Sequence, residues 1–158
     1  MSDSIPITPQ GLLKLKEELK YLKSVERPKI VLAIEEARAH GDLSENAEYD
    51  AAKNRQGQIN SRMLELEDKI ARAQVIDPAT LSSDKVVFGA TVKLLDLDSE
   101  EEVKYQIVGA DESDVKEGKI SILSPIAKSL IGRKQSDIVK ITTPKGSREL
   151  EVLKILFE

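Results

Sequence analysis

Cysteine is absent from this chain of 158 residues, so disulfides, thiolate zinc sites and a cysteine nucleophile are all excluded. Histidine occurs once, at His40, which excludes a pair of histidine metal ligands and leaves a single imidazole base. Tryptophan is also absent, and aromatic residues make up only 3% of the chain. Single-strand binders stack bases on aromatic rings, and ligand pockets are often walled by such rings, so both classes are disfavoured.

An excess of basic residues is lacking as well. The chain has 24 lysines and arginines against 28 aspartates and glutamates, and 24 − 28 gives a net charge of −4. Because free-standing nucleic-acid binders usually carry a basic excess, we expect weak or no binding to free DNA. Residues 1–77 and residues 78–158 each hold 12 basic and 14 acidic residues, so any basic patch must be local.

Long apolar runs are missing too. No stretch approaches the length of a membrane span, and the first residues, Met1-Ser2-Asp3-Ser4, are not a basic segment followed by an apolar run. A signal peptide and a membrane anchor are therefore not expected. We expect a cytoplasmic protein.

Residues 8–74 have the composition and apolar periodicity of long helices. Thr8 is a suitable N-cap and Pro9 a suitable first helical residue. Pro28 lacks a backbone donor and should bend the helix without ending it, because apolar spacing continues on both sides. The apolar residues recur at the spacings of a heptad seam: Leu12, Leu15, Leu19 and Leu22, then Ile30, Ala33, Ile34 and Ala37.

A short turn follows, where Gly41 is suited to the left-handed conformation that ends a helix. A second helix is expected from about Glu45 to Ala73. Two seams on either side of a turn predict an antiparallel coiled-coil hairpin in residues 1–77, with its tip at about residues 41–46. A hairpin with about thirty residues in each arm would project about 45 Å. The seam residues near its tip are small or polar, so the hairpin should be slimmer there. The second seam consists of Tyr49, Ala52, Gln56, Ile59, Met63, Leu66, Ile70 and Ala73.

Residues 78–158 predict a small β-rich domain that follows a linker at Ala79–Asp84. Ser124 is a suitable cap for a short helix that Gly132 would end. The fold class is therefore α+β, with the hairpin followed by an antiparallel sheet and one short helix covering a face. Five β-branched runs between turn residues are the expected strands: Val86–Leu95, Glu102–Val108, Lys119–Ile122, Ile138–Thr142 and Arg148–Leu156.

Asp42 and Glu45 stand three residues apart in the turn, and the sequence alone leaves two interpretations of them. An Asp-x-x-Glu at a helix start is a capping box, and both carboxylates would suit the helix macrodipole. Alternatively, the pair supplies oxygen ligands for a hard cation such as Mg²⁺. Because two carboxylates do not complete such a site, the remaining ligands would have to come from another molecule.

The run from His40 to Tyr49, HGDLSENAEY, closely resembles the tip of the bacterial Gre transcript-cleavage factors, a family of transcription elongation factors. The second arm, with Ala51-Ala52-Lys53 and few consecutive basic residues, resembles the less basic branch of that family. Further Gre-like stretches occur in register along nearly the whole chain: Glu17–Lys23 with Arg27-Pro28, Ala71–Asp77, Phe88–Val92, Ser124–Ala127 and Leu130–Gly132.

This resemblance implies an accessory factor that has no catalytic activity of its own. Gre factors insert their coiled coil into the secondary channel of RNA polymerase, and the acidic pair, Asp42 and Glu45 here, reaches the active site of a backtracked complex. There the pair is expected to help hold an Mg²⁺ shared with the polymerase and to position the water that cleaves the transcript. The implied partners are the polymerase and the nascent RNA 3′ end, and a monomer is expected.

A basic patch follows from the same resemblance. The family contacts the extruded RNA with basic residues on the hairpin, which correspond here to Arg38, Lys53 and Arg55. The alternative is solvated helix surface, paired with acids such as Glu35 and Glu36.

Ser44, Asn46 and Tyr49 are expected to support the tip by orienting the acidic pair. Family tips often carry lysine where this chain has Ser44, and Tyr49 also lies on the predicted seam, where packing is its alternative role. For His40, capping or an exposed surface position is favoured over a role as a base.

The second domain of Gre factors resembles the FKBP prolyl isomerases. An isomerase of that type needs an aromatic-walled pocket, and only Phe88, Tyr105 and Phe157 lie beyond the linker, so we do not expect this activity. In the family this domain docks on the polymerase rim. The candidate contacts are Ser121, Ser124 and Pro125, for which an ordinary loop before a helix is the alternative.

Two other functions stay open at this stage. One is a secondary-channel regulator that binds polymerase without promoting cleavage, which the intact Asp42 and Glu45 pair disfavours. The other is a coiled-coil adaptor that has no relation to polymerase.

Overall fold

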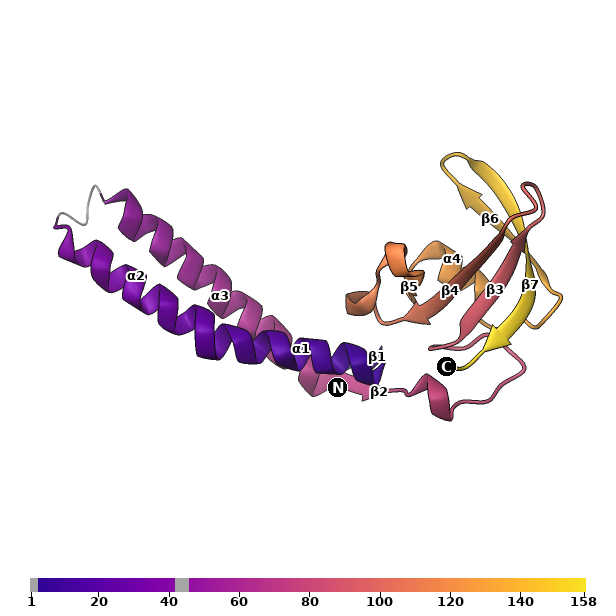
Figure 1. The fold of residues 1–158 in the computed structure, drawn as a ribbon, viewed down its shortest axis with the longest axis horizontal. Helices are drawn as coiled ribbons and strands as arrows, with labels where there is room; N and C mark the ends of the chain where they lie inside the picture. Colours follow the sequence, from indigo (N-terminus) through magenta and orange to yellow (C-terminus); the bar gives the residue numbers. More distant parts are fainter. Residues whose placement is uncertain (1–2, 42–45) are drawn as a thin grey trace. The chain divides into compact units, whose positions relative to one another are not determined.

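The computed structural model describes residues 3–41 and 46–158 (Figure 1). The chain divides into two compact units. The first contains Leu12–Ala73, and the second combines Ser4–Gly11 with Gln74–Glu158, so the second unit is assembled from two separate stretches of the chain. In the described ranges, no helix combines the length and the apolar character needed to cross a membrane.

The first arm of the hairpin begins with α1 (Pro9–Tyr21) and continues through a π-helical turn (Leu22–Glu26) into α2 (Arg27–Ala39). Thr8 caps α1 as predicted, because its Oγ1 accepts a hydrogen bond from the Gly11 N–H at 3.1 Å.

The irregularity expected at Pro28 takes the form of this π-helical turn. Pro28 is the second residue of α2, and a proline has no N–H to donate while its ring crowds the carbonyl four residues earlier. The Arg27 N–H instead donates to the Leu22 carbonyl, five residues back. The wider turn therefore accommodates the proline and lets the arm continue.

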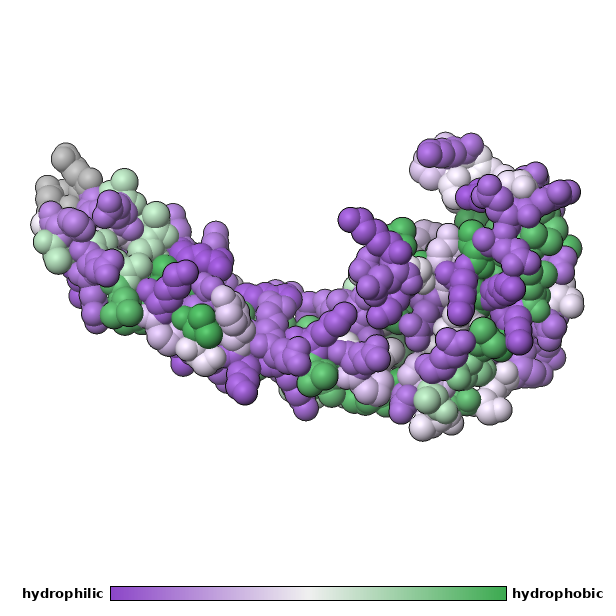
Figure 2. Space-filling view, viewed as in Figure 1, coloured by the Kyte–Doolittle hydropathy of each residue, from purple (hydrophilic) through white to green (hydrophobic). Residues whose placement is uncertain are grey.

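The second arm is α3 (Ala47–Arg72), which runs back antiparallel to the first (Figure 1). It begins two residues later than expected. The predicted seam is confirmed, since all of its members are buried or half-buried, while hydrophilic residues cover much of the hairpin surface in view (Figure 2). The fully buried members are Leu15, Leu22, Ile34, Ala37, Ala52, Ile59, Met63 and Leu66.

This seam supplies most of the hairpin's apolar stabilisation. Burying one large aliphatic side chain contributes about 1.5–3 kcal/mol, whereas an alanine methyl contributes far less. Toward the tip the buried residues are Ala37 and Ala52, while Ile59 and Leu66 lie farther along the shaft. Near the connector the seam therefore buries smaller side chains than the shaft does, and a slimmer tip stays a prediction.

A two-stranded sheet of β1 (Ile5–Ile7) and β2 (Ala73–Val75) was not predicted. The Ile76 N–H extends the pairing by donating to the Ile7 carbonyl at 2.9 Å. Residues near the two ends of the helical segment therefore lie side by side.

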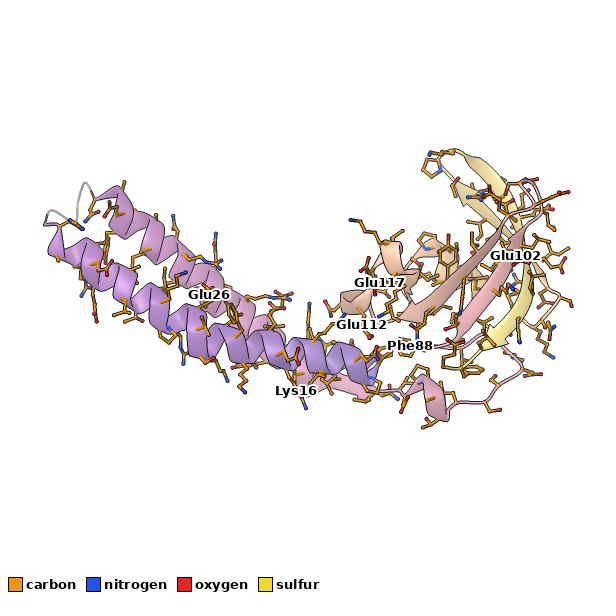
Figure 3. All side chains as sticks on the ribbon, in the orientation of Figure 1. Lys16, Glu26, Phe88, Glu102, Glu112 and Glu117 are labelled. Carbon is orange, nitrogen blue, oxygen red and sulfur yellow. The ribbon has the colours of Figure 1, made fainter. Side chains whose placement is uncertain are left out.

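Glu112 fixes the segment that leads into α1. Its Oε2 accepts hydrogen bonds from the Thr8 N–H at 3.0 Å and the Gly109 N–H at 2.9 Å, and its Oε1 accepts from the Thr8 hydroxyl (Figure 3 labels Glu112). A Cβ at the buried Gly11 would collide with the Glu112 carboxyl group, so a larger residue there would displace the Glu112 side chain from its hydrogen bonds.

The second unit contains a five-stranded sheet with the order β5-β4-β3-β7-β6. Adjacent strands are antiparallel except β5, which pairs parallel with β4. The prediction of a purely antiparallel sheet is therefore wrong at this edge, because residues 109–118 cross over instead of forming a hairpin turn. The strands are β3 (Thr91–Asp96), β4 (Glu102–Val108), β5 (Lys119–Ser121), β6 (Ile138–Thr143) and β7 (Gly146–Leu156).

The strand expected over Val86–Leu95 is shorter than predicted, because β3 begins only at Thr91. Before it, Val86 exchanges backbone hydrogen bonds with the loop after α4, donating to the Arg133 carbonyl and accepting from the Gly132 N–H, both at 2.8 Å. Val86 is fully buried and belongs to the core although it lies outside the sheet.

The predicted short helix is α4 (Pro125–Leu130), which packs against β6. Ser124 caps it as predicted, since its Oγ accepts from the Ala127 N–H at 3.3 Å, and Gly132 beyond it has a positive φ of 85°. The core between α4 and the sheet is formed by Val86, Ala90, Val92, Leu94, Ile107, Ile120, Ala127, Leu130, Val139, Ile141, Leu150 and Val152.

Candidate functional site at the hairpin tip

The connector between the arms comprises residues 40–46, since α2 ends at Ala39 and α3 begins at Ala47. Asp42, Ser44 and Glu45 lie outside the described residues, so their predicted roles stay predictions. The connector starts as expected. The Gly41 N–H donates to the Arg38 carbonyl at 3.2 Å, and the φ of Gly41 is +108°, which favours glycine.

Asn46 caps the second arm. Its Oδ1 accepts a hydrogen bond from the Tyr49 N–H at 3.1 Å, in the geometry of an N-cap. Asn46 is therefore the N-cap of α3, and the capping-box interpretation of Asp42 and Glu45 lies outside the described residues. Sequence reasoning missed this because Asp42 and Asn46 are both good capping residues, and the local pattern does not choose between them.

Three contacts join the two arms around the connector. The Asn46 Nδ2 donates to the Ala37 carbonyl at 2.6 Å, and Asn46 itself is half-buried. The Arg38 guanidinium lies over the Tyr49 ring, 5.9 Å from its centroid, which is a cation–π geometry. The His40 Nε2 lies 3.7 Å from a Glu48 carboxylate oxygen, and both side chains are well exposed.

The structure thus brings together Arg38, Asn46 and Tyr49 from the predicted site. It also adds two acids that sequence reasoning missed, Glu48 and Asp50 in the first turn of α3. Acidic residues at a helix N-terminus stabilise it through the macrodipole, and their position just after a cap was the signal that could have identified them.

The other two members of the predicted basic patch have different surroundings. Lys53 is exposed, and its Nζ donates to the Gln56 Oε1 at 3.2 Å. Arg55 lies 3.7 Å from Glu26 on the first arm, midway along the hairpin (Figure 3 labels Glu26). Glu26 also accepts from the Tyr21 hydroxyl, which raises the pKa of Tyr21. Arg55 is thus a cross-arm partner of the shaft.

The shaft carries a larger ion network centred on Arg62. Its Nε and Nη2 donate to the two Glu18 carboxylate oxygens at 2.6 and 2.8 Å, and its Nη1 lies 3.2 Å from Glu65. The hydrogen bond from Arg62 lowers the pKa of Glu18, and contact with Lys69 and then Arg62 lowers the pKa of Glu65. Within this network the Arg62–Glu18 pair joins the two arms, whereas Glu65 and Lys69 lie on the same helix as Arg62.

The candidate docking residues lie between β5 and α4. The Ser121 Oγ accepts from the Leu123 N–H at 3.0 Å, and the Ser124 hydroxyl donates to the Ser121 carbonyl at 2.7 Å. These bonds form an ordered turn, from which Leu123 extends with 64% of its surface exposed. Leu123 lies within the predicted contact region, although the sequence analysis did not single it out. Pro125 begins α4 and is exposed.

Across residues 3–41 and 46–158, no group of three or more histidine, cysteine, aspartate or glutamate side chains is arranged to hold a metal ion.

Comparison with known proteins assigns the chain to a class. A family model described as transcription elongation factor, N-terminal, matches residues 5–75, and one described as transcription elongation factor, GreA/GreB, C-term, matches residues 81–157. The chain belongs to the GreA/GreB family of transcription elongation factors.

The names of its curated relatives point to one branch of this family, GreA. Transcription elongation factor GreA of Syntrophotalea carbinolica is 57% identical over 157 residues, which is 99% of each chain. Transcription elongation factor GreA of Pelobacter propionicus is 58% identical over 158 residues, the whole of both chains. The resemblance seen in the sequence, including the branch it indicated, is thereby confirmed.

Among solved structures, the GreA factor homolog 1 (Gfh1) protein of Thermus thermophilus is 28% identical, with 96% of this chain and 98% of that chain covered and a TM-score of 0.44. The family assignment rests on the sequence relatives, since this TM-score is too low to support a structural argument.

Proposed function

We propose that this chain is a transcription elongation factor that inserts its hairpin into the secondary channel of RNA polymerase. There it stimulates the polymerase's own cleavage of the nascent transcript in backtracked or arrested complexes, so that elongation resumes. The observation that carries this proposal is the position of Asp42 and Glu45 in a seven-residue connector, residues 40–46, between two helical arms. Because Asn46 caps α3, the acidic pair is not needed for that structural role.

The role proposed for Asp42 and Glu45 is to complete an Mg²⁺ site in the polymerase. Carboxylate oxygens are ligands that Mg²⁺ prefers, and the ion usually needs more than two such ligands. When bound, Mg²⁺ activates a water and stabilises the charge of the leaving oxygen. The chain itself would act as an accessory factor, presenting two carboxylates at the end of an arm whose second helix, at 26 residues, is about 39 Å long.

For the basic patch we propose contact with the nascent RNA through Arg38 and Lys53. Both are exposed and lie within two turns of the connector. Stacking on Tyr49 orients the Arg38 guanidinium while its N–H groups stay available for a phosphate. Arg55 is the weakest member of the patch, because its guanidinium already pairs with Glu26 at 3.7 Å.

The second unit is proposed to dock on the polymerase rim through the turn that contains Ser121, Ser124 and Pro125, with Leu123 as its exposed apolar contact. The factor is proposed to be a cytoplasmic monomer that binds free DNA weakly or not at all, consistent with its net charge of −4.

The test is transcript cleavage in stalled polymerase complexes across an Mg²⁺ titration. Asp42→Asn and Glu45→Gln keep the size of each side chain and remove its charge, and Asp50→Asn is the matched control for a nearby exposed acid. We expect each tip variant to lose at least about tenfold in cleavage rate while it still binds polymerase, and the control to behave as wild type.

Three results would contradict the proposal. Equal cleavage by wild type and Asp42→Asn would remove the ligand role. Inhibition by the wild type without transcript shortening would favour the channel regulator. Failure of the wild type to bind polymerase would favour the unrelated adaptor.

A further inference from the structure

The hairpin has an open groove between its two arms, toward the end away from the connector. The groove has a volume of about 410 Å³, within the range of about 300–1,000 Å³ that ligand pockets occupy, so it can hold more than one side chain. All of its lining residues belong to the first of the two compact units. These residues, here called the basic groove, are Lys16, Leu19, Lys20, Lys23, Ser24 and Ile70.

The basic groove combines an apolar floor with a rim of lysines. The floor is formed by one residue from each arm, Leu19 and Ile70, and both are half-buried. The rim residues Lys16, Lys20 and Lys23 are exposed (Figure 3 labels Lys16). A lysine can lay its aliphatic stem along an apolar surface while its ammonium group stays in water. The groove therefore offers an apolar contact bordered by positive charge.

Two of the three rim charges are not compensated by the hairpin itself. The Lys23 Nζ lies 3.4 Å from a Glu67 carboxylate oxygen on the second arm. Within residues 3–41 and 46–158, the side chains of Lys16 and Lys20 have no carboxylate partner. The groove thus presents two unpaired positive charges, although the net charge of the chain is −4.

The spacing of these two lysines does not help the helix to form. Lys16 and Lys20 stand four residues apart within α1, so their ammonium groups lie on the same face. Like charges at this spacing destabilise a helix, whereas an acid four residues before a lysine stabilises it. The pair therefore has no stabilising role within the hairpin, and an acidic partner would relieve its repulsion.

We propose that the basic groove binds an acidic, amphipathic protein segment of RNA polymerase, an inference that rests on the proposed binding to that enzyme. An apolar side chain of the segment packs on Leu19 and Ile70, and its carboxylates pair with Lys16 and Lys20. From Lys16 to Lys23 the rim extends about 10 Å along the helix axis. The acids of the segment therefore flank its apolar anchor within about two helical turns, as in helix-in-groove recognition.

A nucleic acid fits the basic groove less well than a protein segment does. Phosphates would pair with the lysines but would gain nothing from the apolar floor. Bases bind single-strand sites by stacking on aromatic rings, and none of the six lining residues is aromatic. The combination of an apolar floor and unpaired lysines therefore favours a protein with complementary acidic charge.

The charge reversals Lys16→Glu and Lys20→Glu test the rim. Lys14→Glu is the matched control, because Lys14 is an exposed lysine of the same helix and residues two apart do not share a face. Lys16→Glu also puts an acid four residues before Lys20, which favours the helix, so weaker binding would not reflect a weaker fold. The assay is binding of the full-length chain to purified RNA polymerase over a range of salt concentrations, with circular dichroism as the check on folding.

We expect both groove variants to bind polymerase about five- to tenfold more weakly than the wild type at low salt, with a smaller difference at high salt. Lys14→Glu and the charge-conserving Lys20→Arg should bind as the wild type does, and circular dichroism should be unchanged. Wild-type affinity of both groove variants would overturn the proposal. So would an equal loss in Lys14→Glu, or a loss of affinity that salt does not change.

Cross-linking identifies what occupies the groove. Leu13 is 56% exposed and lies three residues before Lys16, on the same side of α1, so a photo-reactive amino acid in its place reports on the groove. We expect mass spectrometry of the complex with polymerase to find cross-links to an acidic segment of a polymerase subunit. Cross-links to nucleic acid or to a second copy of this chain instead, or none to polymerase, would overturn the proposal.

These measurements separate the groove from the proposed cleavage function, because they record binding. If the wild type binds polymerase through the groove but does not stimulate cleavage, the cleavage function alone fails. If the wild type stimulates cleavage and the groove variants bind as it does, the groove proposal alone fails.

Discussion

Replacing Arg62 with alanine tests whether ion pairs or the apolar seam stabilise the hairpin. Arg62 donates to both carboxylate oxygens of Glu18, at 2.6 and 2.8 Å, in the bidentate geometry of strong ion pairs. A Coulomb estimate at 2.8 Å and an effective dielectric constant of about 20 gives about 6 kcal/mol. That figure is an upper bound, because it ignores desolvation and side-chain entropy.

Exposure of both side chains to solvent reduces the coupling energy expected for the Glu18–Arg62 pair. The Arg62 and Glu18 side chains are 36% and 40% exposed, so water and salt screen the pair and both long side chains lose rotamer freedom when it forms. Measured couplings of exposed pairs are about 0.2–1 kcal/mol, and the bidentate geometry places this pair near the top of that range. We therefore expect a Glu18–Arg62 coupling energy of about 1 kcal/mol.

The assay is a double-mutant cycle of Arg62→Ala and Glu18→Ala, with urea unfolding followed by far-ultraviolet circular dichroism. Arg27→Ala, at an exposed arginine of the first arm, is the control for loss of a basic side chain. A coupling above about 2 kcal/mol would refute the screening argument.

The same cycle has an acid dependence with a defined sign. Arg62 lowers the pKa of Glu18 below its ordinary value of 4.5, so the folded state favours the carboxylate. The coupling should be fully present above the unfolded-state pKa and should disappear as the pH falls through the lower folded-state pKa. A coupling that persists unchanged after Glu18 is protonated would refute its assignment to this ion pair.

Three further perturbations separate the contributions of core, cap and buried charge. Leu66 is fully buried, so Leu66→Ala should destabilise the protein by about 2–5 kcal/mol in urea unfolding. Leu64 is 68% exposed, so Leu64→Ala should change the stability by less than about 0.5 kcal/mol. Similar losses of stability in the two variants would contradict the assignment of Leu66 to the apolar seam. Ser124→Ala removes the cap of α4 and should cost about 1 kcal/mol in the same assay, and no loss would contradict the capping role. Asp96 is 1% exposed, and its hydrogen bonds from Arg148 lower its pKa, so its stabilisation should be lost as the pH falls through that pKa. The thermal unfolding of Asp96→Asn should therefore depend less on pH in the acidic range than that of the wild type, and parallel pH profiles would contradict this.

Elements with strong periodicity were predictable from the sequence. The seam from Leu15 to Leu66 follows the heptad rule, and every member is buried or half-buried. Strand β4 has its predicted bounds, and the caps at Thr8 and Ser124 are those expected. In each case a local pattern and the tertiary packing favour the same conformation.

The elements that were missed depend on contacts distant in sequence. Strands β1 and β2 have three residues each, too few to show alternation, and their pairing joins segments separated by the entire hairpin. The parallel pairing of β5 with β4 reflects the path of the crossover, which no local pattern reports. At the tip, both Asp42 and Asn46 are suitable caps by sequence, and Asn46 is the N-cap of α3 in the structure. The roles of Asp42 and Glu45 rest on the family resemblance and the proposed function.

The assembly of the second unit from two stretches has a consequence for how the family can vary. In topological terms the helical segment, residues 12–73, is an insertion into the β-rich unit. The chain leaves that unit after Gly11 and re-enters it at Gln74, and the bond between Ile7 and Ile76 keeps the exit and the re-entry adjacent. Whole heptads can therefore be added to or removed from both arms together without altering the strand register of the sheet. The length of the helical arms and the fold of the β-rich unit are separately adjustable properties of one chain.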